Sequence, residues 1–323
     1  MLKSLTPVTM AKGLEREVYQ KIAEFFDDYL FSYIEKVIAN DVVYNSNGIV
    51  SALLMGRLKY DNKGLFYSKG KISNNLAKEL EKIGGKWSKT AHGYRIDGKK
   101  LPPDVLQAIA RVNIHNREKI DKIKAYLDGL SDTTEYVRNN LTFDVEINGI
   151  MKNLDVQLKR SVEPIGVIPA DMTDYQIKEI SKNYTNNLGY YIQKWTGSEI
   201  INLRQKLEPF VLAGYRAESL EDMIAKEKNI SQKKAKFLAR QETKLLVAEY
   251  RKNRYKEMGV TRYRWSAVMD ERTRELHREL NGKIFSWDEP PIIDQHTGER
   301  GNPSEAYNCR CIAIPVVDSS FFV

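Results

Sequence analysis

The stretch SQKKAKFLARQETKLLVAEYRKNRYKEM, residues 231–258, indicates the fold class of this 323-residue chain. Its apolar side chains recur at three- and four-residue spacing, which is typical of an amphipathic helix. On a helical projection one apolar stripe contains Ala235, Leu238, Ala239, Leu245, Leu246 and Tyr250. Glu242 and Glu249 fall in the middle of that stripe, where a carboxylate is costly unless it is paired. We therefore expect Glu242 to be a buried structural carboxylate that binds an arginine or a loop amide.

The other side of the same helix is cationic. Between Lys233 and Arg264 the chain has eleven basic and three acidic residues, an excess that equals the net charge of +8 of the whole chain. A localised positive stripe favours a polyanion or an acidic protein surface, although a solvated helix face gives the same pattern. The candidate residues for non-specific binding of double-stranded DNA are Lys233, Lys236, Arg240, Lys244, Arg251 and Arg254.

Helical patterns also dominate the chain before this stretch. They cover residues 14–39, 104–129, 131–160, 173–193, 198–213 and 218–228. Pro164, Pro169 and Gly214 mark joints between them. Residues 64–103 differ, because they predict a strand at 64–73, a helix at 74–84 capped by Ser73 or Asn74, and a further strand or hairpin at 86–96.

The predicted fold class is mainly α, with an elongated helical body and two small α+β parts, one near each end. The division that we expect is an N-terminal helical region at 1–60, a small α+β insert at 61–103, a helical body at 104–259 and a C-terminal module at 260–323. No apolar run approaches the ~18 residues that a membrane span needs, and the N-terminus has no secretory signal pattern. We therefore expect folding in a cytoplasm and no membrane partner.

The C-terminal module contains the residues with metal-binding chemistry. Two thiols and one imidazole, at Cys309, Cys311 and His277, are a combination that zinc favours, and Asp270 is a candidate fourth ligand. Cysteines two residues apart are poorly placed for a disulfide, so we expect reduced thiols. The alternative is a small core in which His277 is hydrogen-bonded and the cysteines are buried as small apolar side chains, with Asp270 capping a turn.

The same region carries a specific resemblance. It consists of Arg-x-Glu-Thr at 240–243, Trp-x-x-x-x-Asp-x-Arg-Thr-x-x-x-His at 265–277, Leu-Asn-Gly at 280–282 and Asn-Cys-Arg-Cys at 308–311. This ordered set resembles the Mu F-like family of phage minor head proteins, also called the SPP1 gp7-like head morphogenesis family. In some relatives Cys-x-x-Cys occupies the places of Arg274 and His277, which favours a structural zinc site here. The matching positions with expected structural roles are Glu242, Trp265, Arg272, Thr273, Asn308 and Arg310.

The resemblance implies a structural and assembly protein rather than an enzyme. Such proteins lie in the virion, in the head interior, and are made in the host cytoplasm. The partners that it implies are the portal protein, the major capsid or scaffolding protein, and DNA. Some relatives carry a toxin domain after this module, and we expect none here because twelve residues follow Cys311.

Two other functions compete with this interpretation. A metal-dependent nuclease would suit a His, Asp and Cys cluster beside a basic surface, but the cluster has one histidine and no carboxylate pair. Alternatively, the insert could bind nucleic acid, because it interleaves basic and aromatic residues as strand-borne readers do. The residues concerned are Lys69, Lys71, Lys86, Lys89, Arg95 and Lys99, with Tyr67, Trp87 and Tyr94.

Overall fold

The computed structural model describes residues 2–39, 48–61, 63–68, 70–130, 133–213 and 217–321. Helices predominate, and two small antiparallel sheets accompany them, so the predicted mainly α class with small α+β parts is confirmed. Lys69 and Gly214, which the sequence singled out, lie outside the described residues. No helix in the described part of the chain is both long and apolar enough to cross a membrane.

The chain forms two compact units, each assembled from separate stretches. The first unit contains Met1–Phe25, Glu135–Gln193 and Gln232–Val323, and the second contains Phe26–Thr134 and Lys194–Ser231. The two longest helices, α8 (Asp174–Ala213) and α9 (Ala217–Glu257), contribute residues to both units. The four consecutive regions expected from the sequence stay a prediction.

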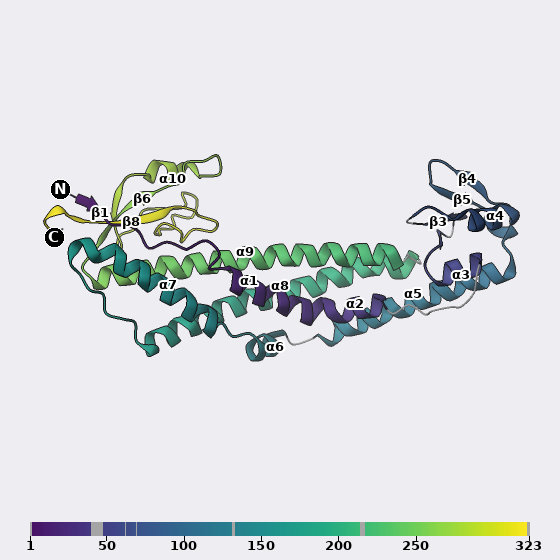
Figure 1. The fold of residues 1–323 in the computed structure, drawn as a ribbon, viewed down its shortest axis with the longest axis horizontal. Coiled ribbons are helices and arrows are strands. Elements are labelled where there is room, and N and C mark those ends of the chain that lie inside the picture. The colour runs from purple at the N-terminus through teal and green to yellow at the C-terminus, as the bar shows by residue number, and fades with distance from the viewer. Residues whose placement is uncertain are drawn as a thin grey trace. The chain divides into compact units, whose positions relative to one another are not determined.

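The first unit combines helices with one sheet (Figure 1). Besides its parts of α8 and α9, its helices are α1 (Arg16–Phe26), α6 (Thr133–Asn140), α7 (Asp144–Val162) and α10 (Glu275–Leu280), with 3₁₀ turns at Glu163–Ile165 and Ser319–Phe321. The strands are β1 (Leu2–Ser4), β6 (Arg262–Ser266), β7 (Ile284–Ser286) and β8 (Ile312–Asp318). They pair antiparallel in the order β1-β8-β6-β7, so strands from the two ends of the chain are neighbours.

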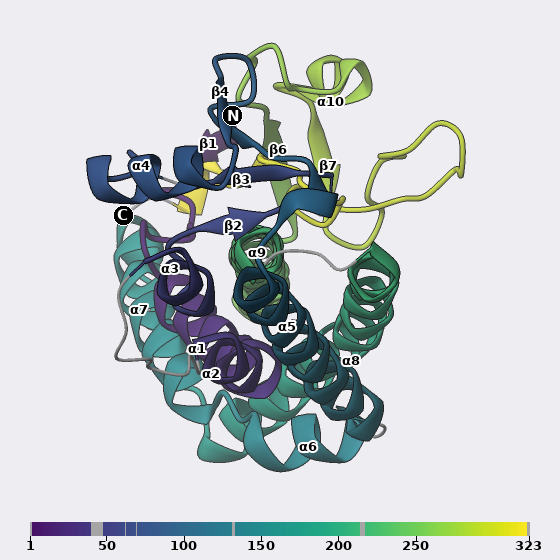
Figure 2. The ribbon, with the colours of Figure 1, turned by 90° about the vertical axis from the view of Figure 1, so that its right-hand side faces the viewer.

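The second unit has its own sheet. Its helices are a π-helical turn at Asp27–Phe31, α2 (Ser32–Ala39), α3 (Ile49–Leu54), α4 (Asn74–Lys82), a 3₁₀ turn at Gly98–Lys100 and α5 (Pro103–Gly129). The strands β2 (Lys59–Tyr60), β3 (Leu65–Tyr67), β4 (Lys86–Ser88) and β5 (Gly93–Arg95) pair antiparallel in the order β2-β3-β5-β4. Figure 2 shows this sheet beside α3 and α5, and buried residues of the sheet, α3, α4 and α5 form one core.

The insert folds much as its sequence indicates. The Ser73 side chain accepts a hydrogen bond from the backbone N–H of Leu76, which confirms the predicted cap of the helix at 74–84. The hairpin expected at 86–96 is present as β4 and β5, with Trp87 opposite Tyr94. The strand expected over 64–73 is shorter and ends at Tyr67.

Three helix boundaries differ from the prediction. The helix expected over 131–160 is two helices, because the buried side chains of Leu141 and Phe143 anchor a break between α6 and α7. The breaks expected at 194–197 and at 229–230 are absent, and α8 and α9 continue through them. Thr196 and Ser231 are fully buried within these helices, so burial outweighs the weak helix propensity of these residues.

The N-terminal segment is fixed to the helices of the first unit. The backbone N–H of Leu5 donates to the Pro315 carbonyl, next to the β1–β8 pairing. Further along, the Tyr255 hydroxyl lies 2.6 Å from the Ser161 hydroxyl, 3.2 Å from the Thr6 carbonyl and 3.3 Å from the Val8 backbone nitrogen. Tyr255 is fully buried in α9, so this network ties the first residues of the chain to α7 and α9.

Candidate metal centre and the basic helix

His277 lies in the short helix α10, on the buried side of the C-terminal module. Its side chain packs edge-on against Trp265 of β6, with ring centroids 5.4 Å apart, and only 2% of the residue is exposed. Trp265 is itself 1% exposed and pairs with Ala313 of β8. The sheet therefore supplies a rigid apolar wall behind the imidazole.

The two cysteines approach His277 from the loop that precedes β8. Both are buried, and the backbone N–H of Cys311 donates to the Cys309 sulfur over 3.4 Å. Asn308, just before them, has a left-handed backbone (φ 57°), which asparagine tolerates better than most residues. The backbone N–H of Asn308 donates to the Gln241 side chain of α9 (3.0 Å), and the Cys309 carbonyl accepts from Lys244 (3.3 Å). The helix that carries Arg-x-Glu-Thr thus holds the cysteine loop.

The three side chains are spaced as zinc ligands are. The Nδ1 atom of His277 lies 3.6 Å from the Cys309 Sγ and 3.5 Å from the Cys311 Sγ, and all three ligand atoms lie within 4.8 Å of one another. Zn–N bonds of about 2.0–2.1 Å and Zn–S bonds of about 2.3 Å in a tetrahedron place N and S about 3.6 Å apart. The site is therefore compatible with zinc in both donor set and geometry.

The charge state of the thiols also suits a cation. The hydrogen bond from Cys311, with the contact to His277, holds the pKa of the Cys309 thiol well below its usual range despite burial. The same hydrogen bond, together with burial, raises the pKa of Cys311, so Cys309 is the thiol that more readily offers a thiolate to a cation. A cavity of about 30 Å³ borders His277, Cys309 and Cys311, which is room for roughly one water as a fourth ligand.

Asp270 is not part of this cluster, contrary to its prediction as the missing ligand. Its carboxylate binds the guanidinium of Arg310 and also accepts from the Thr273 hydroxyl (3.1 Å) and the Arg272 backbone N–H (3.2 Å). The Arg310 hydrogen bonds hold the pKa of Asp270 well below its usual range. The carboxylate therefore fastens its own turn to the cysteine loop.

Two other residues with expected structural roles, Thr273 and Arg272, belong to the turn that starts at Asp270. Thr273 closes the turn through its backbone N–H, which donates to the Asp270 carbonyl, whereas the side chain of Arg272 is exposed. Arg278, which no sequence pattern singled out, donates to the carbonyls of Thr273 and Asp270.

Glu242 is buried as predicted, but its expected partner is not found. In the described part of the chain no hydrogen bond or ion pair of its carboxylate is recorded, and 6% of the residue is exposed. Burial raises the pKa of Glu242. Glu249, assigned to the same apolar stripe, is exposed. The buried face of α9 therefore includes Glu242 but not Glu249.

The basic side of α9 is divided between surface and interior. Lys233, Lys236 and Arg240 are exposed, and Lys244 is half-buried. Arg251 and Arg254 are buried, so their prediction as exposed DNA contacts is wrong. The sheet and the segment before α8 cover them, since Arg251 donates to the Ala313 carbonyl and Arg254 to the Ala170 carbonyl.

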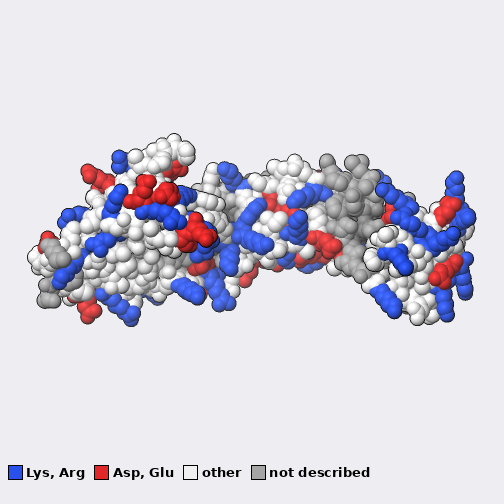
Figure 3. All heavy atoms as spheres, turned by 90° about the horizontal axis from the view of Figure 1, so that it is seen from above, with Lys and Arg blue, Asp and Glu red and all other residues white. Residues whose placement is uncertain are grey.

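Charges of both signs share the surface. On the face drawn in Figure 3, lysines and arginines lie among aspartates and glutamates rather than in one basic stripe. In the insert, Trp87 is half-exposed while Tyr94 is buried against it in a T-shaped contact. Of the basic residues that the prediction named in the insert, Lys71, Lys86, Lys89, Arg95 and Lys99 are exposed. Of the three predicted aromatic residues, Trp87 is exposed, Tyr67 is half-buried and Tyr94 is buried, so a nucleic-acid role of the insert stays a prediction.

Comparison with known proteins places the C-terminal part of the chain in a family. Residues 202–314 match the family model described as Phage Mu protein F like protein. This segment contains the resembling motifs, so its suspected membership of the Mu F-like head morphogenesis family is confirmed. No solved structure matches the chain.

Three relatives share part of the sequence. An uncharacterized protein of Haemophilus influenzae is 38% identical over 103 residues, which are 31% of this chain and 22% of the relative. The NAD(+)--arginine ADP-ribosyltransferase EFV of Enterococcus faecalis is 38% identical over 103 residues, 29% of this chain and 21% of the relative. The minor head protein GP7 of Bacillus phage SPP1 is 28% identical over 128 residues, 37% of this chain and 41% of the relative. The chain thus covers less than half the length of each of these relatives.

Proposed function

We propose that this chain is a phage minor head protein that acts in head assembly and is not an enzyme. The observation that carries the proposal is the match of residues 202–314 to the Mu F-like family, together with the similarity to a minor head protein. The contacts of Gln241 and Lys244 with the cysteine loop are consistent with it, because they join two segments of the matched region into one unit. A site in the head interior, contact with the portal and with the capsid or scaffolding protein, and folding in the host cytoplasm belong to the same proposal.

The proposed role of the metal centre is structural. Zinc bound by His277, Cys309 and Cys311 would fasten the loop before β8 to α10, and a water would complete the coordination. The ligands come from α10 and from the loop before β8, so the binding energy of a metal would add to the stability of the join between these two segments. Arg274 borders the cavity but cannot serve as a ligand.

The proposal also includes contact of the chain with the phage genome. The exposed Lys233, Lys236 and Arg240 would meet phosphates without reading the bases. We expect the full chain to retard duplex DNA at low salt and to lose affinity steeply as salt rises. Charge reversal of these three residues should abolish the retardation, with reversal of the exposed Lys226 of the same helix as a single-site control. Unchanged retardation by the triple variant would place any DNA contact elsewhere.

The nuclease alternative gains no support from the site. The carboxylate that it would need, Asp270, is bound to Arg310, and the cluster itself contains only His277 and the two cysteines. We expect plasmid DNA to stay intact with the protein and Mg²⁺ or Zn²⁺.

The head role has a direct test. Heads purified from a phage that carries this gene should contain the chain at low copy number, as found by mass spectrometry. Deletion of the gene should leave particles that are defective in infection, with restoration by the intact gene. Heads that lack the chain and infect normally without it would refute the proposed function.

A further inference from the structure

A cavity of about 230 Å³ lies in the first unit, beside the metal centre, and shares Arg310 and Cys311 with the small cavity at the ligands. Its walls come from the N-terminal segment, from α9 and from the chain before and at the start of β8. The lining residues are Thr9, Met10, Arg240, Lys244, Val247, Arg251, Ser304, Arg310, Cys311 and Ile312. Four of these ten residues are cationic, and none is acidic.

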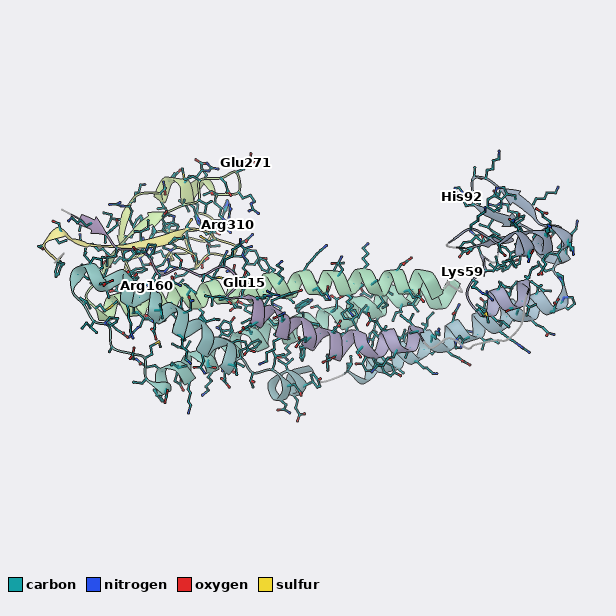
Figure 4. The ribbon with its side chains drawn as sticks, in the orientation of Figure 1. Glu15, Lys59, His92, Arg160, Glu271 and Arg310 are labelled. Atoms are coloured by element: carbon teal, nitrogen blue, oxygen red, sulfur yellow. The ribbon has the colours of Figure 1, made fainter. Side chains whose placement is uncertain are left out.

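Three of the cations share one face of α9. Arg240, Lys244 and Arg251 are separated by four and seven residues, which returns the side chains to the same side of a helix after about one and about two turns. Arg310, labelled in Figure 4, reaches the cavity from the opposite side, in the cysteine loop. Positive side chains therefore face the cavity from two elements that the fold brings together.

Arg251 is the residue that most needs an anion. It is only 3% exposed, and one Nη atom donates to the Ala313 carbonyl over 3.3 Å. Its Nε atom is buried with no hydrogen-bond partner, and no ion pair of Arg251 is recorded in the described part of the chain. A buried guanidinium without a counter-ion is costly, and a buried donor without an acceptor adds to that cost.

The nearby carboxylates do not neutralise the cavity. Asp270 binds Arg310 and no other cation. Glu305 accepts from the backbone and side chain of Asn302 and acts on Arg251 only through space. Glu15, just before α1, acts on Lys244 through space, and Cys309 acts in the same way on Lys244 and Arg251. Neither glutamate lines the cavity, so an excess of positive charge remains there.

We propose that this cavity binds a phosphate group, carried by a phosphate ester. Arginine forks and a lysine ammonium suit its oxygens, and the partly desolvated setting strengthens these charge-assisted hydrogen bonds. Met10, Val247 and Ile312 provide an apolar wall, which suits the carbon skeleton of an ester rather than a bare ion. The phosphate can come from a nucleic-acid end or backbone, or from a small free ester.

The proposal does not depend on the role in a phage head. It assigns a defined pocket that shares Arg240 with the genome contact proposed above, whereas Lys233 and Lys236 of that contact do not line the cavity. A chain that binds phosphate but is absent from heads would refute only the proposed function, and a head protein without phosphate binding would refute only the pocket.

The test uses the full chain and inorganic phosphate as the probe. Thermal unfolding is followed in phosphate and in chloride at equal ionic strength and pH. The pocket variant is Arg240→Gln with Lys244→Gln, and the control is Lys233→Gln with Lys236→Gln, which makes the same charge change on the same helix outside the cavity. Phosphate also stabilises proteins generally, so the rise in Tm from chloride to phosphate is compared between variants. The excess shift is the rise for a given protein minus the rise for the pocket variant.

We expect phosphate to raise the Tm of the wild type and the control by several degrees more than that of the pocket variant. Arg251→Met adds a second readout, since it should lose the excess shift while melting no lower than the wild type in chloride. If a 5′-phosphorylated oligonucleotide suppresses the excess shift, nucleic acid is the source of the phosphate. If glycerol phosphate suppresses it and the oligonucleotide does not, the source is a small free ester. Equal phosphate shifts in wild type, control and pocket variant would overturn the proposal.

Discussion

The Nδ1 atom of His277 lies 3.5 Å from the sulfur of Cys311, although 34 positions of sequence separate the two residues. This contact joins the turn that follows β6 to the loop that precedes β8. Gln241 and Lys244 of α9 form hydrogen bonds with the backbone of the same loop. Three segments of the region that matches the family thus converge on one buried cluster, and their stability should depend on one another.

Replacement of Tyr255 by phenylalanine should destabilise the first unit. The change removes a buried hydroxyl that binds Ser161, the Thr6 carbonyl and the Val8 backbone nitrogen, and leaves these groups without that partner. We expect a loss of about 1–3 kcal/mol in the free energy of unfolding, measured by denaturant titration. Tyr175→Phe, at a position that is 73% exposed, is the control and should change little. Equal stability of Tyr255→Phe and wild type would contradict the network.

Glu242→Gln should stabilise the protein at neutral pH. Burial raises the pKa of Glu242, so the folded state binds its proton more tightly than the unfolded chain does. Stability from this residue is therefore present below its ordinary pKa of about 4.3 and is lost as pH rises through the raised value. The gain of Glu242→Gln over wild type should accordingly grow from acid to neutral pH. The exposed Glu249→Gln should show no such trend, and a parallel trend in both variants would argue against a buried, unpartnered carboxylate.

Much of the helical fold could be predicted from the sequence because its signals are local. The stripe around Leu246 and the Ser73 cap each depend on residues within a few turns of one another. Where burial decides, local signals fail, as at Ser231, which looks like a helix start and lies inside α9. The three residues of β1 carry no pattern at all, and only pairing with β8 makes them a strand.

The candidate site was predictable in its chemistry and less so in its contacts. His277, Cys309 and Cys311 are rare residue types whose affinity for metal is visible without a fold. Whether Arg251 faces solvent depends on β8, which lies about 60 residues further along, so periodicity could not exclude it from the exposed face. Gln241 and Arg278 carry no distinctive signal, because their roles are hydrogen bonds to the backbone of distant loops.

Asp270→Asn should lower the thermal stability of the C-terminal module without removing zinc. The variant loses the ion pair with Arg310, whereas the metal ligands are unchanged. Melting temperature and zinc content of the same preparation separate the two effects. Asp288→Asn, which removes an exposed ion pair with Lys256, is a matched control for the loss of a surface charge. Loss of zinc from Asp270→Asn at an unchanged melting temperature would restore Asp270 as a ligand.

Arg274→Cys should strengthen metal binding. Arg274 borders the small cavity together with the three ligands, so a thiolate there is placed to complete a tetrahedral site. The change also removes the hydrogen bond from Arg274 to the Tyr307 carbonyl, so Arg274→Ser serves as the control for that loss. Competition with a zinc chelator should show tighter retention by Arg274→Cys than by wild type or Arg274→Ser. Weaker retention than in the serine variant would show that the position does not reach the metal.

The zinc content of the wild-type chain tests the central claim most directly. Protein purified without chelator and kept reduced should contain about one zinc per chain by elemental analysis. Cys309→Ser and His277→Ala should lose that zinc and melt at a lower temperature, while Arg272→Ala, an exposed neighbour, should retain it. Reduced wild-type protein that is free of metal, and whose melting temperature does not change when zinc is added, would contradict the account.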